Sequence, residues 1–169
     1  SEQGDLGKRV YSINQNYSWG RDMEAAIVDN ADRFDYQVVD KVLHEVNRIQ
    51  DFSPFVARIK SENPDSVITG NWSNDLLLLM KAVGDANLDI TFGTIFMDQP
   101  GNVANAGDVA EGHYVAHSSN IELLDEAGTE AYKKATGHYP VFIEPTTLNG
   151  VGLFAEALKK VNFDGGDID

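Results

Sequence analysis

Residues 9–20 read RVYSINQNYSWG: a strand-like apolar run passes into a turn with Tyr17 and Trp19, and apolar positions at spacings of three and four then predict a helix. The pattern recurs at residues 66–73, SVITGNWS, where Trp72 follows the strand and a helix comes next. Ligands of open parallel α/β sheets bind outside the carboxyl ends of the strands. Two aromatic turns of this kind therefore predict a ligand-binding wall at that edge. The alternative is that the aromatic residues only cap the sheet.

Strand-like and helical segments alternate along the chain. The predicted strands are residues 10–14, 36–39, 67–69, 90–97 and 112–116, with 42–46 either extending the second strand or belonging to the next loop. The predicted helices are residues 20–34, 53–63, 76–83, 121–135 and 145–161. This order predicts an α/β fold with a doubly wound, mainly parallel five-stranded sheet, flavodoxin-like, with helices on both faces and two further C-terminal helices. We expect one lobe at residues 1–120 and the C-terminal helices at 121–169.

The last predicted helix is apolar nearly all round, with Leu148, Val151, Leu153 and Phe154 on different faces. Such a helix needs cover on most of its faces, and one five-stranded sheet can cover only one. The pattern therefore predicts a missing partner, either another lobe or another chain. We expect the isolated chain to form a homodimer, to swap this helix, or to pack it in a non-native place.

Composition excludes several classes of function. The 169 residues carry 27 acidic against 13 basic side chains, a formal net charge of −14, so we expect no binding to nucleic acid or to anionic membranes. No apolar run approaches the roughly 20 residues that cross a bilayer, and the acidic start lacks the features of a signal peptide. The absence of cysteine removes thiol catalysis, zinc ribbons and disulfides.

Motifs for cofactors and catalysis are missing from the sequence. No glycine-rich phosphate loop and no G-x-S-x-G nucleophile elbow occurs. His113 and His117 are four residues apart, but in a strand that spacing separates them too far for a shared metal ion. We expect no cofactor, no metal and no catalytic residue. A small hydrolase that pairs Asp98 with one of these histidines is the enzymatic alternative.

Four ordered blocks of sequence resemble one known family. They are residues 8–20, 51–60, 64–72 and 107–112, read in this order and at this spacing. The chain resembles the type I periplasmic substrate-binding proteins of ABC importers, in the Leu/Ile/Val-binding branch and its relatives for aromatic acids and amides. Members have about twice this length, with two α/β lobes joined by hinge strands. The resemblance implies that this chain is the second lobe of a periplasmic, non-catalytic protein, without the first lobe.

The same resemblance implies the site. It carries over an aromatic ligand contact from the first strand-to-helix turn to Tyr17 and another from the third to Trp72. An acidic residue that contacts a ligand amino group matches Asp98, although the loop at 98–102 is shorter than in the leucine-binding branch. Further candidates for the same cleft are Trp19, Asn71 and Gln99.

The implied ligand is a small solute: a branched-chain amino acid, an aromatic acid or an amide. The implied partner, through the full-length protein, is the ABC permease. A ligand-sensing receptor or regulator domain with the same lobe is the other alternative.

Overall fold

The computed structural model describes residues 6–99, 101–117, 126–163 and 165–166. The chain divides into two compact units, residues 1–116 and 117–169, which are described separately below. The predicted boundary at 120/121 lies within 118–125, outside the described residues.

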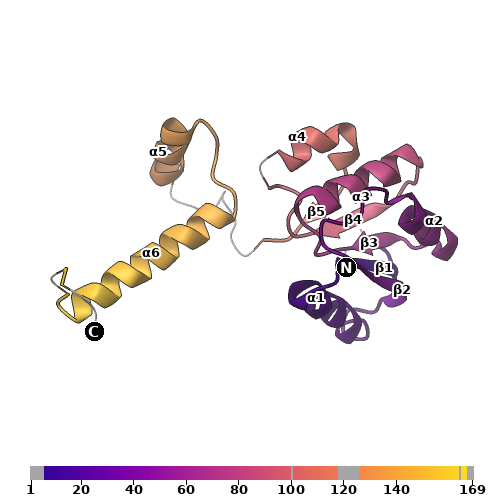
Figure 1. Cartoon of the computed structure of the whole chain (residues 1–169), viewed down its shortest axis with the longest axis horizontal. Coiled ribbons are helices and arrows are strands. Elements are labelled where there is room, and N and C mark those ends of the chain that lie inside the picture. Colours follow the sequence, from indigo (N-terminus) through magenta and orange to yellow (C-terminus); the bar gives the residue numbers. More distant parts are fainter. Residues whose placement is uncertain (1–5, 100, 118–125, 164, 167–169) are drawn as a thin grey trace. The chain divides into compact units, whose positions relative to one another are not determined.

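The first unit is built on a five-stranded sheet in the order β2-β1-β3-β4-β5, in which every neighbouring pair is parallel (Figure 1). Its strands are β1 (Arg9–Gln15), β2 (Gln37–His44), β3 (Ser66–Ile68), β4 (Thr91–Thr94) and β5 (Tyr114–Val115). The parallel, doubly wound architecture predicted from the sequence is confirmed.

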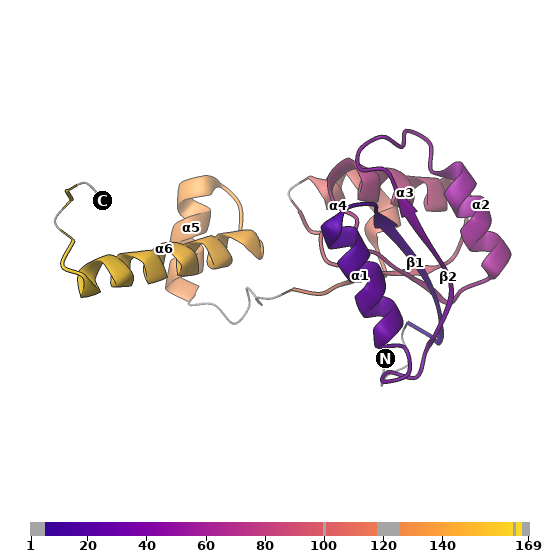
Figure 2. The same ribbon diagram turned by 60° about the horizontal axis from the view of Figure 1, so that its bottom comes forward.

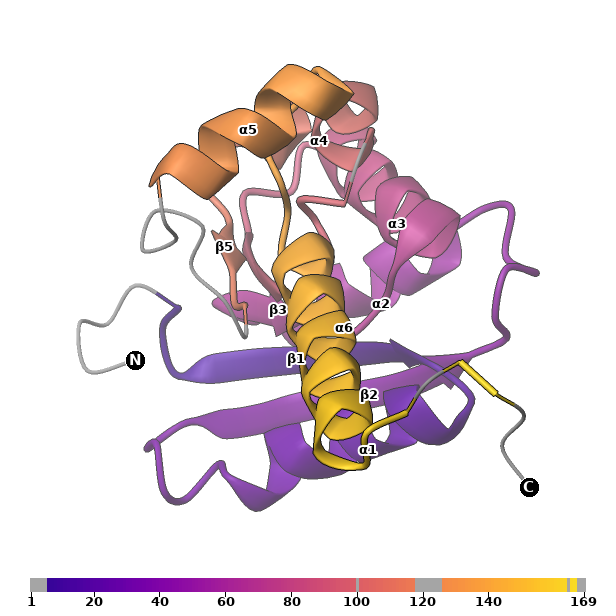
Figure 3. The ribbon, with the colours of Figure 1, turned by 90° about the vertical axis from the view of Figure 1, so that its left-hand side faces the viewer.

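Helices cover both faces of this sheet. They are α1 (Ser18–Asp29), α2 (Ser53–Glu62), α3 (Ser73–Asp85) and the short α4 (Asn102–Ala106), followed by a 3-10 turn, η1 (Gly107–Ala110). Figure 2 shows α1 beside β1 and β2, and Figure 3 shows α2 and α3 on the opposite side of the sheet from α1. The crossovers on two faces bring every strand-to-helix turn to the carboxyl edge of the sheet.

The main core lies between the sheet and the α2–α3 layer. Its strand residues include Tyr11, Ile13, Val67 and Phe92, and each of these residues has an exposed fraction of 0%. The facing residues from the helices and the adjoining loops are Phe52, Val56, Ile59, Leu79, Val83 and Ile90. This continuous apolar layer fixes the strands, and with them the positions of the turns at their carboxyl ends.

Local signals set the ends of α2. Pro54 occupies the first turn, where its missing N–H costs nothing. Ser53 does not cap the helix; instead its backbone N–H donates to Asp51 Oδ1 at 2.8 Å. At the other end Asn63 adopts the left-handed conformation, with φ of 46°, and Pro64 follows. The chain then turns directly into β3.

Two predicted elements are shorter in the structure. The helix predicted to reach Phe34 ends at Asp29, because the chain enters a series of turns that brings Asp35 to a φ of 52°. The strand predicted at 90–97 spans Thr91–Thr94 only, and its residues alternate between half-buried and buried. After Thr94 the chain bends, and Met97 packs in a small cluster under α3. The apolar run was wrongly interpreted as one long strand, and α4 and η1 were missed.

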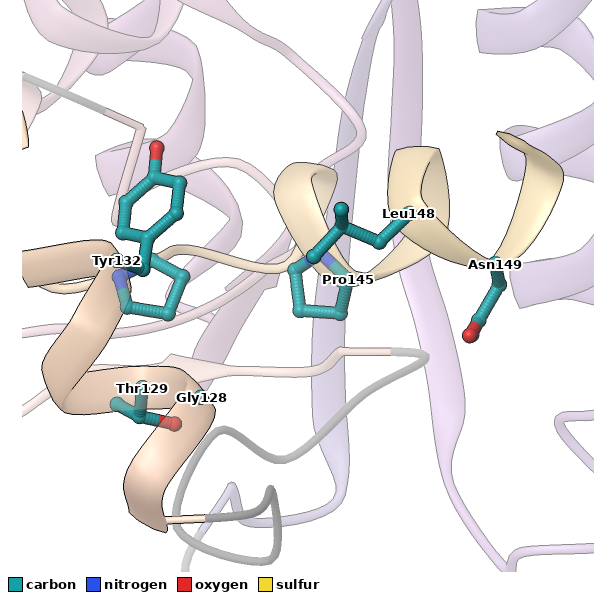
Figure 4. A pocket seen from close by; sticks show the side chains of 7 residues that line it. Gly128, Thr129, Tyr132, Pro145, Leu148 and Asn149 are labelled. Atoms are coloured by element: carbon teal, nitrogen blue, oxygen red, sulfur yellow. The ribbon is translucent and has the colours of Figure 1, made fainter. Parts of the chain in front are cut away.

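The second unit contains α5 (Glu126–Thr136) and α6 (Ile143–Lys160). Tyr132 on α5 donates to Glu144 Oε1 on α6 at 3.0 Å, and the Val141 N–H donates to Glu144 Oε2 at 2.8 Å. A pocket of about 220 Å³ lies between the helices, with Tyr132, Pro145 and Leu148 in its wall (Figure 4). The predicted start of the first helix, residues 121–125, lies outside the described residues.

The apolar side chains of α6 are exposed, as its pattern predicted. Leu148, Val151, Leu153 and Phe154 have exposed fractions of 66%, 62%, 74% and 62%. Across the described residues, no helix combines the length and the apolar character needed to cross a bilayer.

The buried Tyr11 makes the stability of the first unit depend on pH at the alkaline end. Burial raises its pKa to about 12; the Arg58 guanidinium opposes this rise and the Asp40 carboxylate adds to it. The neutral phenol therefore stabilises the fold below about pH 10, and this contribution is lost as the pH rises through about 12. We expect absorbance titration to show Tyr11 among the last tyrosines to ionise. The Tyr11→Phe variant should lack that step, and an unchanged titration curve would contradict the assignment.

Candidate functional site

The turn between β1 and α1 is unusually tight. The Tyr17 N–H donates to the Gln15 carbonyl at 2.9 Å, and the chain folds so closely that a Cβ on Gly20 would lie 1.8 Å from the same oxygen. Only glycine therefore fits at position 20. Tyr17 is the N-cap residue of α1, in an extended conformation. This geometry holds the Tyr17 side chain at the carboxyl edge of the sheet.

The turn after β3 is held by its neighbours. The Gly70 N–H donates to Asn14 Oδ1 at 2.7 Å, and Thr69 Oγ1 donates to the Ile13 carbonyl at 2.5 Å, so β1 fixes the turn through two bonds. From α1, Trp19 Nε1 donates to the Gly70 carbonyl at 2.9 Å. These bonds fix the backbone immediately before Trp72.

The two aromatic turns meet at this edge. Trp72 Nε1 donates to the Tyr17 hydroxyl at 2.9 Å, although 55 residues separate them in the sequence. The prediction that the two rings lie at the same edge of the sheet is confirmed. We call Tyr17, Trp19 and Trp72 the aromatic wall. Because the Tyr17 oxygen accepts from Trp72, its own proton points elsewhere and remains a donor for another group.

Gln99 and Asp98 come from the turn after β4. The Ser73 N–H, next to Trp72, donates to Gln99 Oε1 at 3.3 Å, so Gln99 lies at the start of α3. Asp98 precedes it in the same turn and is half-buried. Phe96 brings this turn to the aromatic wall, since its ring lies 5.6 Å from that of Trp19. The Ser73 side chain makes no capping bond to α3, whose N-cap residue is Trp72.

A buried polar cluster lies beneath the wall, formed by Gln15, His44, Asn71 and Asp75, with exposed fractions of 0%, 4%, 0% and 0%. Gln15 Nε2 donates to Asp75 Oδ2 at 2.7 Å, and the Asn47 N–H donates to the same oxygen at 2.8 Å. Asn71 Nδ2 lies 2.9 Å from His44 Nε2. Asn71, a candidate ligand contact from the sequence, is fully covered in this structure and contacts His44.

The sequence did not point to Gln15, His44 or Asp75 as parts of the site. A usable signal was present for two of them, because Gln15 and His44 are polar residues that directly follow apolar strand segments. Asp75 is an acid in the first turn of a helix, a position that the helix dipole alone explains. Its two donors come from Gln15 at the end of β1 and from Asn47 after β2. No local pattern in the sequence contains these contacts.

The described residues offer little for metal or proton-transfer chemistry. They contain no group of three or more His, Asp or Glu side chains placed to hold a metal ion. His113 uses both ring nitrogens within the fold: Nδ1 accepts from the Phe92 N–H at 3.2 Å and Nε2 lies 2.9 Å from the Val109 carbonyl. Burial lowers its pKa, which favours the neutral ring. A hydrolase that uses His113 with Asp98 gains no support from this geometry.

Comparison with known proteins identifies the family of this chain. The family model described as "Periplasmic binding protein" matches residues 1–169. The chain belongs to the periplasmic binding protein family. It is 57% identical to the Leu/Ile/Val-binding protein homolog 4 of Brucella abortus (strain 2308), over 99% of this chain and 41% of that protein. The chain therefore spans about two-fifths of the length of this relative.

Solved structures of periplasmic binding proteins share the fold. A leucine-, isoleucine-, valine-, threonine- and alanine-binding protein from Brucella ovis, in its closed conformation, superimposes with a TM-score of 0.87 at 57% identity, over 99% of this chain and 44% of that one. A solute-binding protein from Rhodopseudomonas palustris BisB5, in complex with 3,4-dihydroxybenzoic acid, gives a TM-score of 0.73 at 25% identity, over 90% and 44%.

Proposed function

We propose that this chain is one lobe of a bi-lobed solute-binding protein of the periplasm, which delivers a small solute to an ABC importer without catalysing a reaction. The observation that carries the proposal is the bond of 2.9 Å between Trp72 and Tyr17, which joins two strand-to-helix turns into one aromatic surface. Large aromatic faces with a few polar groups provide contact area and orientation for a small ligand. In the full-length protein, the partner of this lobe is the importer's permease.

The ligand we propose is a branched-chain amino acid, an aromatic acid or an amide. The names of the relatives support this range, since one binds leucine, isoleucine and valine by name and another was crystallised with 3,4-dihydroxybenzoic acid. Within the wall, Tyr17, Trp72 and Trp19 supply apolar contact. Gln99 and Asp98 supply polar contacts, with Asp98 facing a ligand amino group where one is present. Asn71 supports the aromatic wall from its buried side and does not itself contact the ligand.

Ligand titration of the chain, followed by the indole N–H signals in ¹⁵N NMR spectra, tests the proposal. Leucine, 3,4-dihydroxybenzoate and benzamide represent the three ligand classes. We expect at least one of them to shift the Trp72 signal with a dissociation constant of about 1 mM or weaker, because one lobe supplies only part of the contacts. The Tyr17→Ala variant should lose this shift.

The matched control is Phe34→Ala, which removes an exposed aromatic ring from outside the wall; Phe34 is 53% exposed. This variant should bind as the unaltered chain does. Equal shifts in the Tyr17→Ala variant, or no shift with any of the three ligands, would reject the wall as a ligand site.

We also propose that the exposed apolar face of α6 is a contact surface for a second copy of the chain. Sedimentation velocity should show association that rises with concentration. Phe154→Ser should weaken it, because this side chain is 62% exposed and apolar. Val103→Ser, at an exposed apolar position outside α6, is the control. A monomer at every concentration contradicts the proposal.

A further inference from the structure

His44 is a buried titratable group beneath the aromatic wall. It ends β2, opposite Gln15 in the register of β1, and only 4% of its surface is exposed. Its ring meets the edges of Phe52 and Phe55, with centroids 5.2 Å and 5.9 Å away. These ring contacts hold the imidazole in one orientation. Its two nitrogens contact Asn71 and the Glu45 carbonyl.

Two contacts define the charge state of His44 in the structure. Asn71 Nδ2 is a donor only, so His44 Nε2 at 2.9 Å accepts its hydrogen and carries no proton. The Glu45 carbonyl is an acceptor only, so His44 Nδ1 at 3.1 Å donates to it. The ring is therefore neutral, with its proton on Nδ1. If Nε2 also carried a proton, that N–H would face the NH₂ group of Asn71 in its present orientation. Two donors would then point at each other.

Three acceptor atoms of the buried polar cluster have no donor among the described residues. Gln15 Oε1, Asn71 Oδ1 and Asp75 Oδ1 are all buried, and none of them has a hydrogen-bond partner among the described residues. Buried acceptors without donors are costly. His44 is the histidine of this cluster, and histidine is the residue type that serves as a switch near physiological pH.

In the part of the chain that the structure describes, the groups in contact with the His44 ring are uncharged. Asp75 on α3 belongs to the same cluster, and Glu45 follows His44 in the chain. The ring contacts with Phe52 and Phe55 bring no charge, and Gln15 and Asn71 are neutral amides. A proton on His44 therefore adds a positive charge to a ring whose polar contacts are the Asn71 amide and the Glu45 carbonyl.

We propose that His44 is a positioning residue for the aromatic wall, whose protonation rotates the Asn71 amide. A proton from solvent binds Nε2, the Asn71 side chain turns by half a rotation, and Oδ1 accepts the new Nε2–H. The amide NH₂ then takes the place that Oδ1, a buried atom without a hydrogen-bond partner among the described residues, occupies now. Because Asn71 adjoins Trp72 in the chain, this exchange alters the surroundings of the Trp72 indole and its bond to Tyr17. The consequence, pH-dependent ligand binding, rests on the proposed function.

The experiment uses the fact that the chain has only two tryptophans, so its ¹⁵N NMR spectrum has only two indole N–H signals. The Trp19→Phe variant assigns them. Over about pH 5 to 8, the range in which histidine titrates, we expect the Trp72 signal to shift with the same midpoint as the His44 ring signals. His44→Gln keeps an acceptor for Asn71 and should keep a folded spectrum, but the pH-dependent shift should be lost.

His113→Gln is the matched control, because it removes a half-buried histidine next to β5, the edge strand opposite β2 in the same sheet. It should retain the Trp72 shift. A Trp72 signal that stays constant while His44 titrates, a shift that persists in His44→Gln, or a His44 ring that does not titrate in this range would each overturn the proposal. No ligand is added, so the outcome is separate from that of the ligand titration.

Discussion

Gly20→Ala is expected to destabilise the first unit by about 3 kcal/mol or more, beyond the usual range for an overpacked site. An alanine Cβ at this position would lie 1.8 Å from the Gln15 carbonyl oxygen and 2.8 Å from its carbonyl carbon. Both are main-chain atoms at the end of β1, so no side-chain rotation relieves the contact. Either α1 moves away from the sheet or β1 breaks its pairing, and both changes displace Tyr17. Urea unfolding followed by circular dichroism measures the loss.

Gly150→Ala is the matched control for this substitution. Gly150 lies within α6, and no atom approaches within 4 Å of its added Cβ. Alanine in a helix interior is favoured over glycine by about 1 kcal/mol, so this variant should leave the unfolding of the first unit unchanged. If the Gly20→Ala variant unfolds at the same urea concentration as the unaltered chain, then α1 does not approach the Gln15 carbonyl as closely as the structure shows.

The parallel sheet and most of its elements were predictable because their signals are local. Apolar strands, helical spacing and Pro54 are each visible within one window of sequence. The failures came where one pattern supports two structures. Residues 90–97 form an apolar run that suits a buried strand, but the chain leaves the sheet after Thr94 and packs Met97 under α3. Tertiary packing decides such a run, and its composition does not.

The candidate site also has features that the sequence predicts and features that it does not. Tyr17 and Trp72 were predictable as neighbours because parallel strands place their carboxyl ends at one edge. The burial of Asn71 and the roles of His44 and Asp75 were not predictable, because they depend on contacts between β2, β3 and α3. Polar residues at strand ends serve equally as ligand contacts or as supports. Only the three-dimensional arrangement shows that Asn71 is buried in this structure.

Asp75→Ala is expected to cost about 3 kcal/mol of unfolding free energy and to disorder the aromatic wall. Asp75 Oδ2 accepts from Gln15 Nε2 and from the Asn47 N–H, and the carboxylate is fully buried. Alanine would leave both donors without an acceptor, and a buried donor left unpaired costs about 1–3 kcal/mol. Gln15 lies two residues before Tyr17, and Asp75 three residues after Trp72, so their bond also ties the two turns together. We expect a broadened Trp72 indole signal in this variant.

Asp75→Asn separates the hydrogen bonds from the charge. Asparagine keeps one oxygen, which can accept from Gln15 and Asn47 as Oδ2 does, and its NH₂ replaces Oδ1, an oxygen that has no donor among the described residues. Removing a buried charge is itself favourable, so we expect the unfolding free energy to stay within about 1 kcal/mol of the original and the Trp72 signal to stay sharp. Asp85→Ala, an exposed acid at the other end of α3, controls for loss of charge alone and should change stability by no more than about 0.5 kcal/mol. If the alanine and asparagine variants at position 75 are equally destabilised, the negative charge stabilises the turns; if neither is destabilised, the cluster does not support the wall.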